Sequence, residues 1–521
     1  MEQKNLSRFA EILIKTFEKE ETQNNDKKIV VSPVISKVAN WYEKFRNAVD
    51  YREEEVILRA SIERILRRRL LFGGTGRTIA EPLVRELVWA KYFPDESLSE
   101  SIIDKIESDI NLYLKLRELI LIKKQLDEKV INEWIYHLMS SAIEHILHTH
   151  AKNEIMNNFI FHIMKDNITI TDDDKQTNDA QIFIAVRRSF AKDDLAFLRY
   201  HLFTQFFGPL NENNLEQTAD SFMEGYKEII RQLNYPRKDK IYNHIRRRTA
   251  MFFILEDLLR SFKSDFKELY KNEEEFKSAV FAACNNRYKS ISSKVKTAII
   301  RSVIFILLTK VFFAFGVEGA FESAIFGRVI WGSILLNLFI PPILMVIAGF
   351  FIKTPGRNNS ERVFSYMKLA LSEEHPKLGN PLVIKRAREK REIDSIFTFL
   401  WFTTFVLAFG AIIFILIKLH FNVISQGVFI VFLALVSFFS YRISQSANIY
   451  TIEIKHNITS SITDFLFMPF IRVGRKLSEG ISQINLLLFI LDFAIETPFK
   501  GLFSFFEQWL FFLQSKREEL E

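Results

Sequence analysis

Four residues interrupt the long apolar stretches of this sequence and are the ones best placed to do chemistry inside a membrane. Lys310 lies within one apolar run, and Asn337 lies one helical turn before the adjacent prolines Pro341 and Pro342 in the next. A charge inside such a run is costly and often functional, and a proline removes a backbone hydrogen bond. These residues could line a transport path along a broken helix. We favour a packing role, in which the Lys310 ammonium extends to the outer interface and the prolines kink their helix.

The segment Gly73–Thr78 is the glycine-rich loop of the chain, with the sequence GGTGRT. A phosphate-binding loop needs backbone N–H groups that converge between a strand and a helix, with a lysine before Ser or Thr. Here a helical pattern precedes the loop, and Arg77 stands where that lysine is expected. We therefore predict a turn between two helices, with glycines at positive φ, and no bound nucleotide.

Histidines and carboxylates gather between residues 133 and 150. Glu133, His137, Glu144 and His148 fall near one face of a predicted helix, because steps of four, seven and four approximate whole turns. Imidazole and carboxylate suit zinc or iron, but one helix cannot close a metal site. We expect a solvated polar face. Cys284 has no CxxC partner and is expected to be a small buried residue. The sequence thus predicts no catalytic residue, metal or cofactor.

Three basic stretches, at residues 67–69, 246–248 and 385–391, could attract nucleic acid. No nucleic-acid-binding motif accompanies them, so we do not expect that partner. The third stretch adjoins an apolar run, where each basic residue contributes roughly 1 kcal/mol of attraction to anionic lipid headgroups. Its members are Lys385, Arg386, Arg388, Lys390 and Arg391.

Composition separates the chain into two parts. Charged residues make up 26% of the 521 residues, which excludes a protein embedded in membrane throughout, and a single cysteine excludes a disulfide framework. Apolar runs of spanning length begin only after residue 297. The four predicted spans are residues 298–315, 329–352, 396–417 and 423–441.

The distribution of Lys and Arg beside these spans predicts their orientation. The connection 353–395 is strongly basic, whereas Gly316–Gly327 contains Glu318 and Glu322 but no Lys or Arg. Basic connections stay in the cytoplasm. Despite the minor exceptions Arg328 and Lys418, the alternation predicts a multi-pass protein of the cytoplasmic membrane with both termini in the cytoplasm.

The flanking regions are predicted to be helical as well, which makes the chain all-α. Residues 1–31 carry an amphipathic helix without the features of a secretory signal peptide. Residues 32–295 form a cytoplasmic domain of amphipathic helices, with a short strand proposed at Gln181–Val186. Residues 296–444 hold the spans, and residues 445–521 hold apolar pieces too short to cross a bilayer. We expect these last pieces to be amphipathic helices in the cytoplasmic interface or on the bundle, with Phe505, Phe506, Trp509, Phe511 and Phe512 in the aromatic zone.

The C-terminal sequence resembles that of a known group of proteins. MPFIRVGRKLSEGISQINLLLFILDFAIETPFK, followed by FEQWLFFLQSKREELE, resembles the end of uncharacterised integral membrane proteins of small-genome bacteria. The resemblance covers about the last 220 residues. It implies a location in the bacterial cytoplasmic membrane and supplies neither an activity nor functional residues.

Three functions are compatible with this sequence. The leading hypothesis is a non-enzymatic, membrane-anchored helical platform that gathers a cytoplasmic protein partner, or further copies of itself, at the inner leaflet. The second is a channel or transporter for ions or small solutes that uses Lys310, Asn337 and the two prolines. The third is a membrane-bound enzyme.

Overall fold

The fold is all-α, as the sequence predicts. The computed structural model describes residues 6–19, 28–50, 54–71, 73–148, 151–171, 173–327, 331–384, 391–452 and 467–477, with scattered positions between 502 and 513. About 81% of the described residues are helical. In the described ranges the extended structure is limited to the pair β1 (Ile168–Ile170) and β2 (Leu382–Ile384), apart from one isolated bridge between Lys28 and Ser99.

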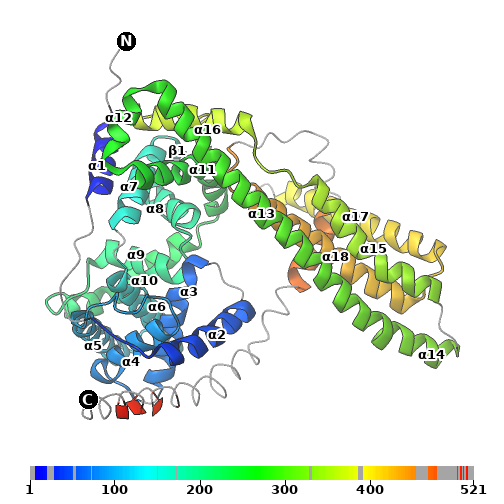
Figure 1. The fold of residues 1–521 in the computed structure, drawn as a ribbon, viewed down its shortest axis with the longest axis horizontal. Helices are drawn as coiled ribbons and strands as arrows, with labels where there is room; N and C mark the ends of the chain where they lie inside the picture. The colour runs from blue at the N-terminus through cyan, green and yellow to red at the C-terminus, as the bar shows by residue number, and fades with distance from the viewer. Residues whose placement is uncertain are drawn as a thin grey trace. The chain divides into compact units, whose positions relative to one another are not determined.

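The chain divides into two compact units (Figure 1). The N-terminal unit comprises Leu6–Arg246 and Glu374–Val383, and the C-terminal unit comprises Arg247–Glu373 and Ile384–Gln483. The boundary falls within α11 (Lys238–Phe262), whereas the sequence places the change from cytoplasm to membrane near residue 296.

Helix α6 is at the centre of the core of the N-terminal unit. It packs against α3, α5 and α9, while α4 and α10 cover α5. Trp134 of α6 is 1% exposed and meets the ring of Phe222 edge-on at 6.1 Å. The apolar stripes of these helices supply the buried side chains, and Asp127 and Asp194 cap the N-termini of α6 and α9. The bounds of these helices are α3 (Glu54–Leu70), α4 (Gly76–Trp89), α5 (Ser101–Ile122), α6 (Glu128–Leu147), α9 (Leu195–Phe207) and α10 (Leu215–Leu233).

Smaller elements surround this core. Helix α1 buries its apolar face against α7. Asn167 connects the segment Glu374–Val383 to the rest of the unit, because its side chain accepts from the Leu378 N–H and donates to the Pro376 carbonyl. The strand proposed at Gln181–Val186 is wrong: this segment belongs to helix α8, and the strand is β1. The elements are α1 (Arg8–Glu18), α2 (Pro33–Asp50), α7 (Ala151–Lys165), α8 (Lys175–Val186) and the π-helical segment η1 (Arg187–Ala191).

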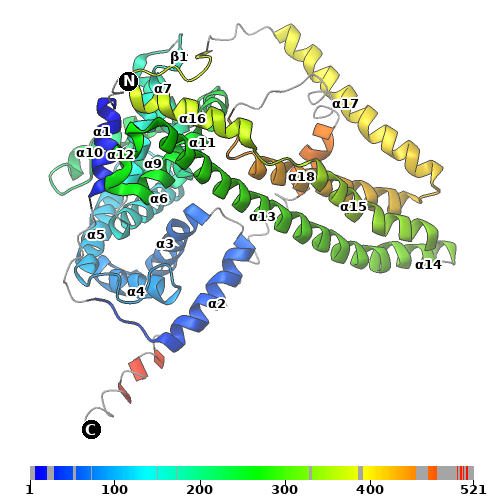
Figure 2. The same ribbon diagram turned by 45° about the horizontal axis from the view of Figure 1, so that its top comes forward.

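The described residues contain four helices that are long and apolar enough to cross a membrane, which confirms the predicted number. Three of them, α13 (Glu273–Phe313), α15 (Trp331–Phe351) and α18 (Val423–Ala447), pack against one another. The fourth, α17 (Arg391–Lys418), contacts α18 (Figure 2). It is the least enclosed of the four, because only 11% of its most apolar stretch is buried.

The first of these helices differs from the prediction at its far end. The sequence predicts that the first span ends at residue 315, but the helix continues through the π-helical segment η3 (Ala314–Gly319) and α14 (Ala320–Phe326). Gly327, at a φ of 62°, ends it. Glu318 and Glu322 therefore lie on a helix rather than in a loop.

Helix α15 runs through both prolines without a break. A proline cannot donate to the carbonyl four residues earlier, so the Asn337 carbonyl loses its helical partner. Pro341 and Pro342 are both buried. The helix therefore continues through the prolines, and the break that a transport path would use is not present there.

On the cytoplasmic side predicted by sequence, the connection 353–395 contains a packed helix. Helix α16 (Arg357–Ser372) lies on α13, where Asn359 donates to the Tyr288 hydroxyl at 2.6 Å and to the Tyr450 carbonyl at 2.7 Å. Two short elements, η2 (Lys263–Asp265) and α12 (Phe266–Lys271), connect α11 to α13.

Part of the C-terminal tail packs on the apolar helices. Residues 467–477 form a helix whose Phe470 is 4% exposed, within a cluster that includes Leu416 and Phe429. At Gly474 a Cβ atom would lie 2.1 Å from the carbonyl oxygen of Ala434, so the two backbones touch. The other apolar pieces of the tail, apart from scattered exposed positions such as Phe505, Phe506, Trp509 and Phe512, lie outside the described residues, as does Phe511.

We predict that Gly474→Ala destabilises the C-terminal unit although alanine favours helices more than glycine does. The added methyl group must push α18 and the 467–477 helix apart, and such overpacking typically costs about 1–3 kcal/mol. Thermal unfolding in detergent measures the effect. The matched control is Gly427→Ala in α18, where no atom lies within 4 Å of the added Cβ. Equal melting temperatures for the two variants would contradict the packing at Gly474.

Candidate functional site

A buried polar cluster between the apolar helices is the best candidate site. Lys310, Glu318 and Asn337 are each fully buried. The Lys310 ammonium donates to Asn337 Oδ1 at 2.6 Å and lies 3.5 Å from Glu318 Oε1. The Asn337 amide donates to Glu318 Oε2 at 2.7 Å. The three side chains thus close a ring of hydrogen bonds that joins α13, η3 and α15.

The start of α18 completes the cluster. Ser425 donates through its hydroxyl to Glu318 Oε2 at 3.0 Å, and its carbonyl accepts from the Asn337 amide at 3.2 Å. Asn422 caps α18 by accepting from the Ser425 N–H and donates to Glu322 Oε1 at 2.7 Å. Glu322 is fully buried as well. We call these six residues, Lys310, Glu318, Glu322, Asn337, Asn422 and Ser425, the Lys310 cluster.

The π-helical segment η3 positions Glu318 toward Lys310. In a regular α-helix eight residues turn through about 800°, which would place Glu318 about 80° away from the Lys310 face. The wider turns of a π-helix rotate less per residue and bring the carboxylate back toward that face. Irregular helical turns of this kind often occur at functional sites.

The charges of the Lys310 cluster do not balance. It holds one ammonium and two carboxylate side chains, and the ammonium also lies 4.6 Å from the centre of the Phe432 ring. Charges buried together need both opposite charge and hydrogen bonds to offset their lost hydration. The side chains of Asn337, Asn422 and Ser425 supply those hydrogen bonds.

Below the cluster the three-helix interior is apolar. Ile306, one turn from Lys310, packs with Met345, Phe432 and Val436 in a continuous cluster of buried side chains. These residues come from α13, α15 and α18, the same helices that hold the polar groups. The cluster therefore closes one end of an apolar bundle.

Sequence reasoning identifies two of the six residues of this site. Lys310 and Asn337 were identified as candidates, but the prediction that Lys310 extends to the outer interface is wrong, because its ammonium bonds to Asn337 inside the bundle. Glu318 and Glu322 appear in the sequence only as charges of the connection between the first two spans, and Asn422 and Ser425 are not among its candidates. The available signal was the spacing of the two carboxylates by four residues, which puts both on one helical face.

The glycine-rich segment joins α3 to α4, as predicted for a turn between helices. Gly73 has a φ of 76°, and the Gly76 N–H donates to Asn111 Oδ1 at 2.9 Å. A Cβ at Gly76 would lie 2.4 Å from the Glu107 carbonyl, so this glycine allows α4 to approach α5. Thr78 accepts from the Thr75 N–H, which engages a second of the loop's donors.

The predicted polar face of α6 is solvated only in part: Glu133 and His148 are exposed, whereas His137 is half-buried and Glu144 is buried. Arg199 donates through one nitrogen to Glu133 Oε1 and to His137 Nδ1, both at 2.8 Å. Glu144 is 4% exposed, while His148 is the C-cap of the helix. The expectation of a solvated face is therefore wrong for His137 and Glu144, which lie against α3 and α9, while Glu133 and His148 are exposed as expected. Thr149 and His150 lie outside the described residues.

Burial changes the protonation of this face. It raises the pKa of the Glu144 carboxyl to about 8, an effect that the nearby Arg59 only partly offsets. Burial also lowers the pKa of His137 to about 4, against the attraction of Glu63. Near neutral pH, Glu144 is therefore largely protonated and the His137 imidazole is neutral. A neutral imidazole can accept the hydrogen bond that Arg199 donates to its Nδ1.

The other candidates have structural partners or fall outside the described residues. In the first basic stretch Arg67 and Arg68 pair with Glu63 and Glu86 at 2.6 and 2.5 Å. Cys284 is fully buried, as expected. Lys385, Arg386, Arg388 and Lys390 lie outside the described residues, and Arg391 is the first residue of α17.

The described residues contain no group of three or more His, Cys, Asp or Glu that could hold a metal ion. No family model matches the chain, and no curated protein or solved structure is similar to it. The fold therefore defines a class only: an all-α protein with four helices able to cross a membrane. The resemblance of its tail to bacterial membrane proteins stays a prediction.

We predict that Lys310→Met and Glu318→Gln each destabilise the C-terminal unit more than the double variant does. Removing one partner of a buried pair leaves an uncompensated polar group and costs about 3–5 kcal/mol, whereas replacing both is often nearly neutral. Thermal unfolding of the detergent-solubilised protein gives the coupling through a double-mutant cycle. Lys418→Met, at the exposed end of α17, is the control. Simple additivity of the two single changes would contradict the pairing.

We predict that Glu144→Gln stabilises the protein at pH 8 and much less at pH 5. The pKa of Glu144 is about 8 in the folded chain against an ordinary value of 4.5, so its contribution to stability is lost as pH rises between these values. One pKa unit corresponds to about 1.4 kcal/mol, so the gain is on the order of a few kcal/mol. Melting temperatures from pH 5 to 8 measure it. Glu118→Gln, at an exposed carboxylate of α5, should leave the pH profile unchanged.

Proposed function

We propose that this chain is a multi-pass protein of the bacterial cytoplasmic membrane whose N-terminal unit is a non-catalytic platform for protein interaction at the inner leaflet. The observation that carries the proposal is the closed interior of α13, α15 and α18. The polar groups of the Lys310 cluster bond to one another, and apolar side chains fill the bundle below them. A bundle of this kind suits an anchor better than a conduit.

The construction of the N-terminal unit supports the same function. Its main core cluster is built from residues between Ile29 and Leu233 alone, so the unit has an interior of its own. Large apolar side chains of this unit are exposed, among them Trp41 at 69% and Val38 at 43% on one face of α2. Exposed apolar groups of this size mark candidate contact sites for a protein partner or a second copy.

The orientation belongs to the proposal as well. The basic residues of the connection 353–395 favour its retention in the cytoplasm, together with both termini. In this arrangement the Lys310 cluster lies toward the outer leaflet, and the N-terminal unit lies in the cytoplasm where a soluble partner can reach it.

Transport is the second candidate, and one specific observation favours it. The Lys310 cluster contains two buried carboxylates and a single ammonium inside apolar helices, and such groups often mark a path for ions or protons. For transport to occur the cluster must open to both sides of the membrane, which requires α13, α15 and α18 to separate.

We expect a photo-crosslinking side chain at position 41 to capture one defined protein, or a second copy of the chain, in intact cells. The exposed Trp41 face provides the contact, so the same substitution at Lys115, an exposed residue of α5, should yield no such adduct. Mass spectrometry of the purified adduct identifies the partner. Adducts that are equally abundant and varied at both positions would contradict a platform on this face.

Liposome measurements separate the two candidate functions. The purified protein should conduct neither protons nor monovalent cations across the membrane above the level of empty liposomes. A proton or cation flux that the wild type supports and Glu318→Gln abolishes would overturn the platform in favour of transport. Because Glu318→Gln can lower stability, its folded fraction in the liposomes is compared with that of the Lys310→Met/Glu318→Gln double variant.

A further inference from the structure

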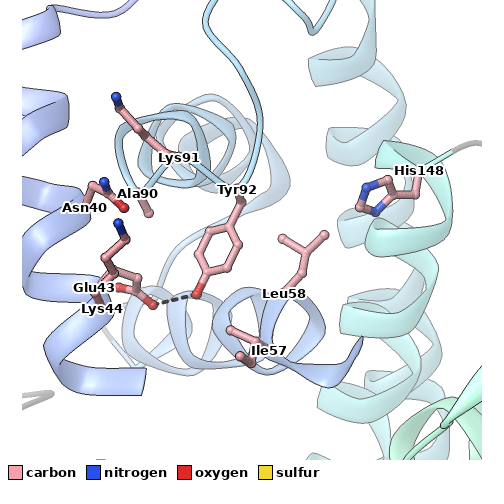
Figure 3. Close-up of a pocket in the computed structure, with 9 residues that line it drawn as sticks. All are labelled: Asn40, Glu43, Lys44, Ile57, Leu58, Ala90, Lys91, Tyr92 and His148. Carbon is pink, nitrogen blue, oxygen red and sulfur yellow. Dashed lines mark hydrogen bonds between the residues drawn. The ribbon is translucent and has the colours of Figure 1, made fainter. Parts of the chain in front are cut away.

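A cavity in the N-terminal unit has the size and the lining of a small-molecule site. It has a volume of about 360 Å³ and lies between α2, the start of α3, and the ends of α4 and α6 (Figure 3). Ligand pockets in proteins usually range from about 300 to 1,000 Å³. We call it the Tyr92 cavity. The lining consists of Asn40, Glu43, Lys44, Ile57, Leu58, Ala90, Lys91, Tyr92 and His148.

One wall of the cavity is fixed by a hydrogen-bond network. Glu43 is 3% exposed, and its Oε1 accepts from Arg64 at 2.6 Å and from the Tyr92 hydroxyl at 2.8 Å. Ser61 also donates to it, at 3.2 Å. Figure 3 shows the bond that holds the Tyr92 ring across the cavity. The negative charge of Glu43 is therefore already engaged by Arg64.

Two lysines leave the cavity with an excess of positive charge. Lys44 and Lys91 are exposed, and no hydrogen bond or ion pair to another described residue engages either ammonium. The helices α4 and α6 end here, and helix C-termini carry partial negative charge worth about half a charge each. Ala90, Lys91 and Tyr92 already donate to the last carbonyls of α4, so the two full positive charges prevail.

The rest of the lining is apolar or neutral. In Figure 3 Ile57 lies below the Tyr92 ring, Leu58 lies beside the ring, and His148 lies on the far side of Leu58. Burial lowers the pKa of His148, so its imidazole adds little positive charge near pH 7. Asn40, beside Lys44, adds a polar amide. The cavity thus joins a cationic rim to an apolar floor.

We propose that the Tyr92 cavity binds a small organic anion, a carboxylate or phosphate group on a short aliphatic chain. The anionic group lies at Lys44, Lys91 and Asn40, and the chain covers Ile57 and Leu58. This site does not depend on the proposed platform function, because it is built within the N-terminal unit and uses neither Trp41 nor the Lys310 cluster.

Titration of the purified full-length protein with hexanoate, hexyl phosphate, hexylammonium and inorganic phosphate tests the proposal, with ligand-observed NMR as the readout. We expect hexanoate or hexyl phosphate to bind at least tenfold more tightly than hexylammonium, and the stronger of the two identifies the anionic group. Inorganic phosphate should bind more weakly than hexyl phosphate because it lacks the aliphatic chain. Equal affinity for hexylammonium, or no binding by either hexyl anion, would overturn the site.

Two variants place the binding in this cavity. Lys44→Gln/Lys91→Gln should weaken binding at least tenfold, and because both side chains are exposed the fold should not change. The control, Lys105→Gln on α5, removes an exposed lysine outside the lining and should keep wild-type affinity. Ile57→Phe should reduce the affinity for the hexyl chain by filling the floor. Unchanged affinity in the double lysine variant would refute the assignment.

Discussion

The packing of α13, α15 and α18 depends on the bonding needs of one buried ammonium. Lys310 is fully buried among apolar helices, where water does not supply hydrogen bonds. Its partners must therefore come from the protein, and they come from η3 and α15, whose Glu318 and Asn337 bond in turn to the start of α18. Apolar contacts alone define helix positions loosely in lipid, because lipid tails compete for them. The polar bonds fix both the register and the neighbours of these helices.

The irregular features of this region follow from the same need. Without η3, Glu318 would point about 80° away from the Lys310 face, by the geometry of a regular α-helix. The helix must also continue past Phe313 for Glu318 and Glu322 to reach the interior at all. At the other side of α18, close contact depends on the absence of a side chain, since Gly474 meets the Ala434 carbonyl. Polar bonds and a backbone contact thus organise different faces of one helix.

Hydropathy predicted the number of apolar helices and the all-α class because lipid and protein interiors are both apolar and both favour long runs of apolar side chains. It failed where irregular or tertiary structure determines the surroundings of a residue. Glu322 bonds to Asn422, 100 residues further along the chain, and Glu318 reaches Lys310 through the π-helical turns of η3. The α6 face is likewise predicted to be solvated throughout, but Arg199 of α9 bonds to His137 there. Local spacing identifies a face as polar, but only tertiary structure determines whether water or protein covers it.

This distinction bears on the choice between an anchor and a transporter. A transport site must exchange its bonds with a passing ion, whereas each described polar contact of Glu318 is made by another part of the bundle. Opening the cluster would expose Lys310 and Glu318 to an apolar medium at a cost of several kcal/mol per ion. A transporter must recover that cost with water or a bound ion in the opened state. An anchor requires no opened state, so the geometry of the closed bundle is sufficient for it.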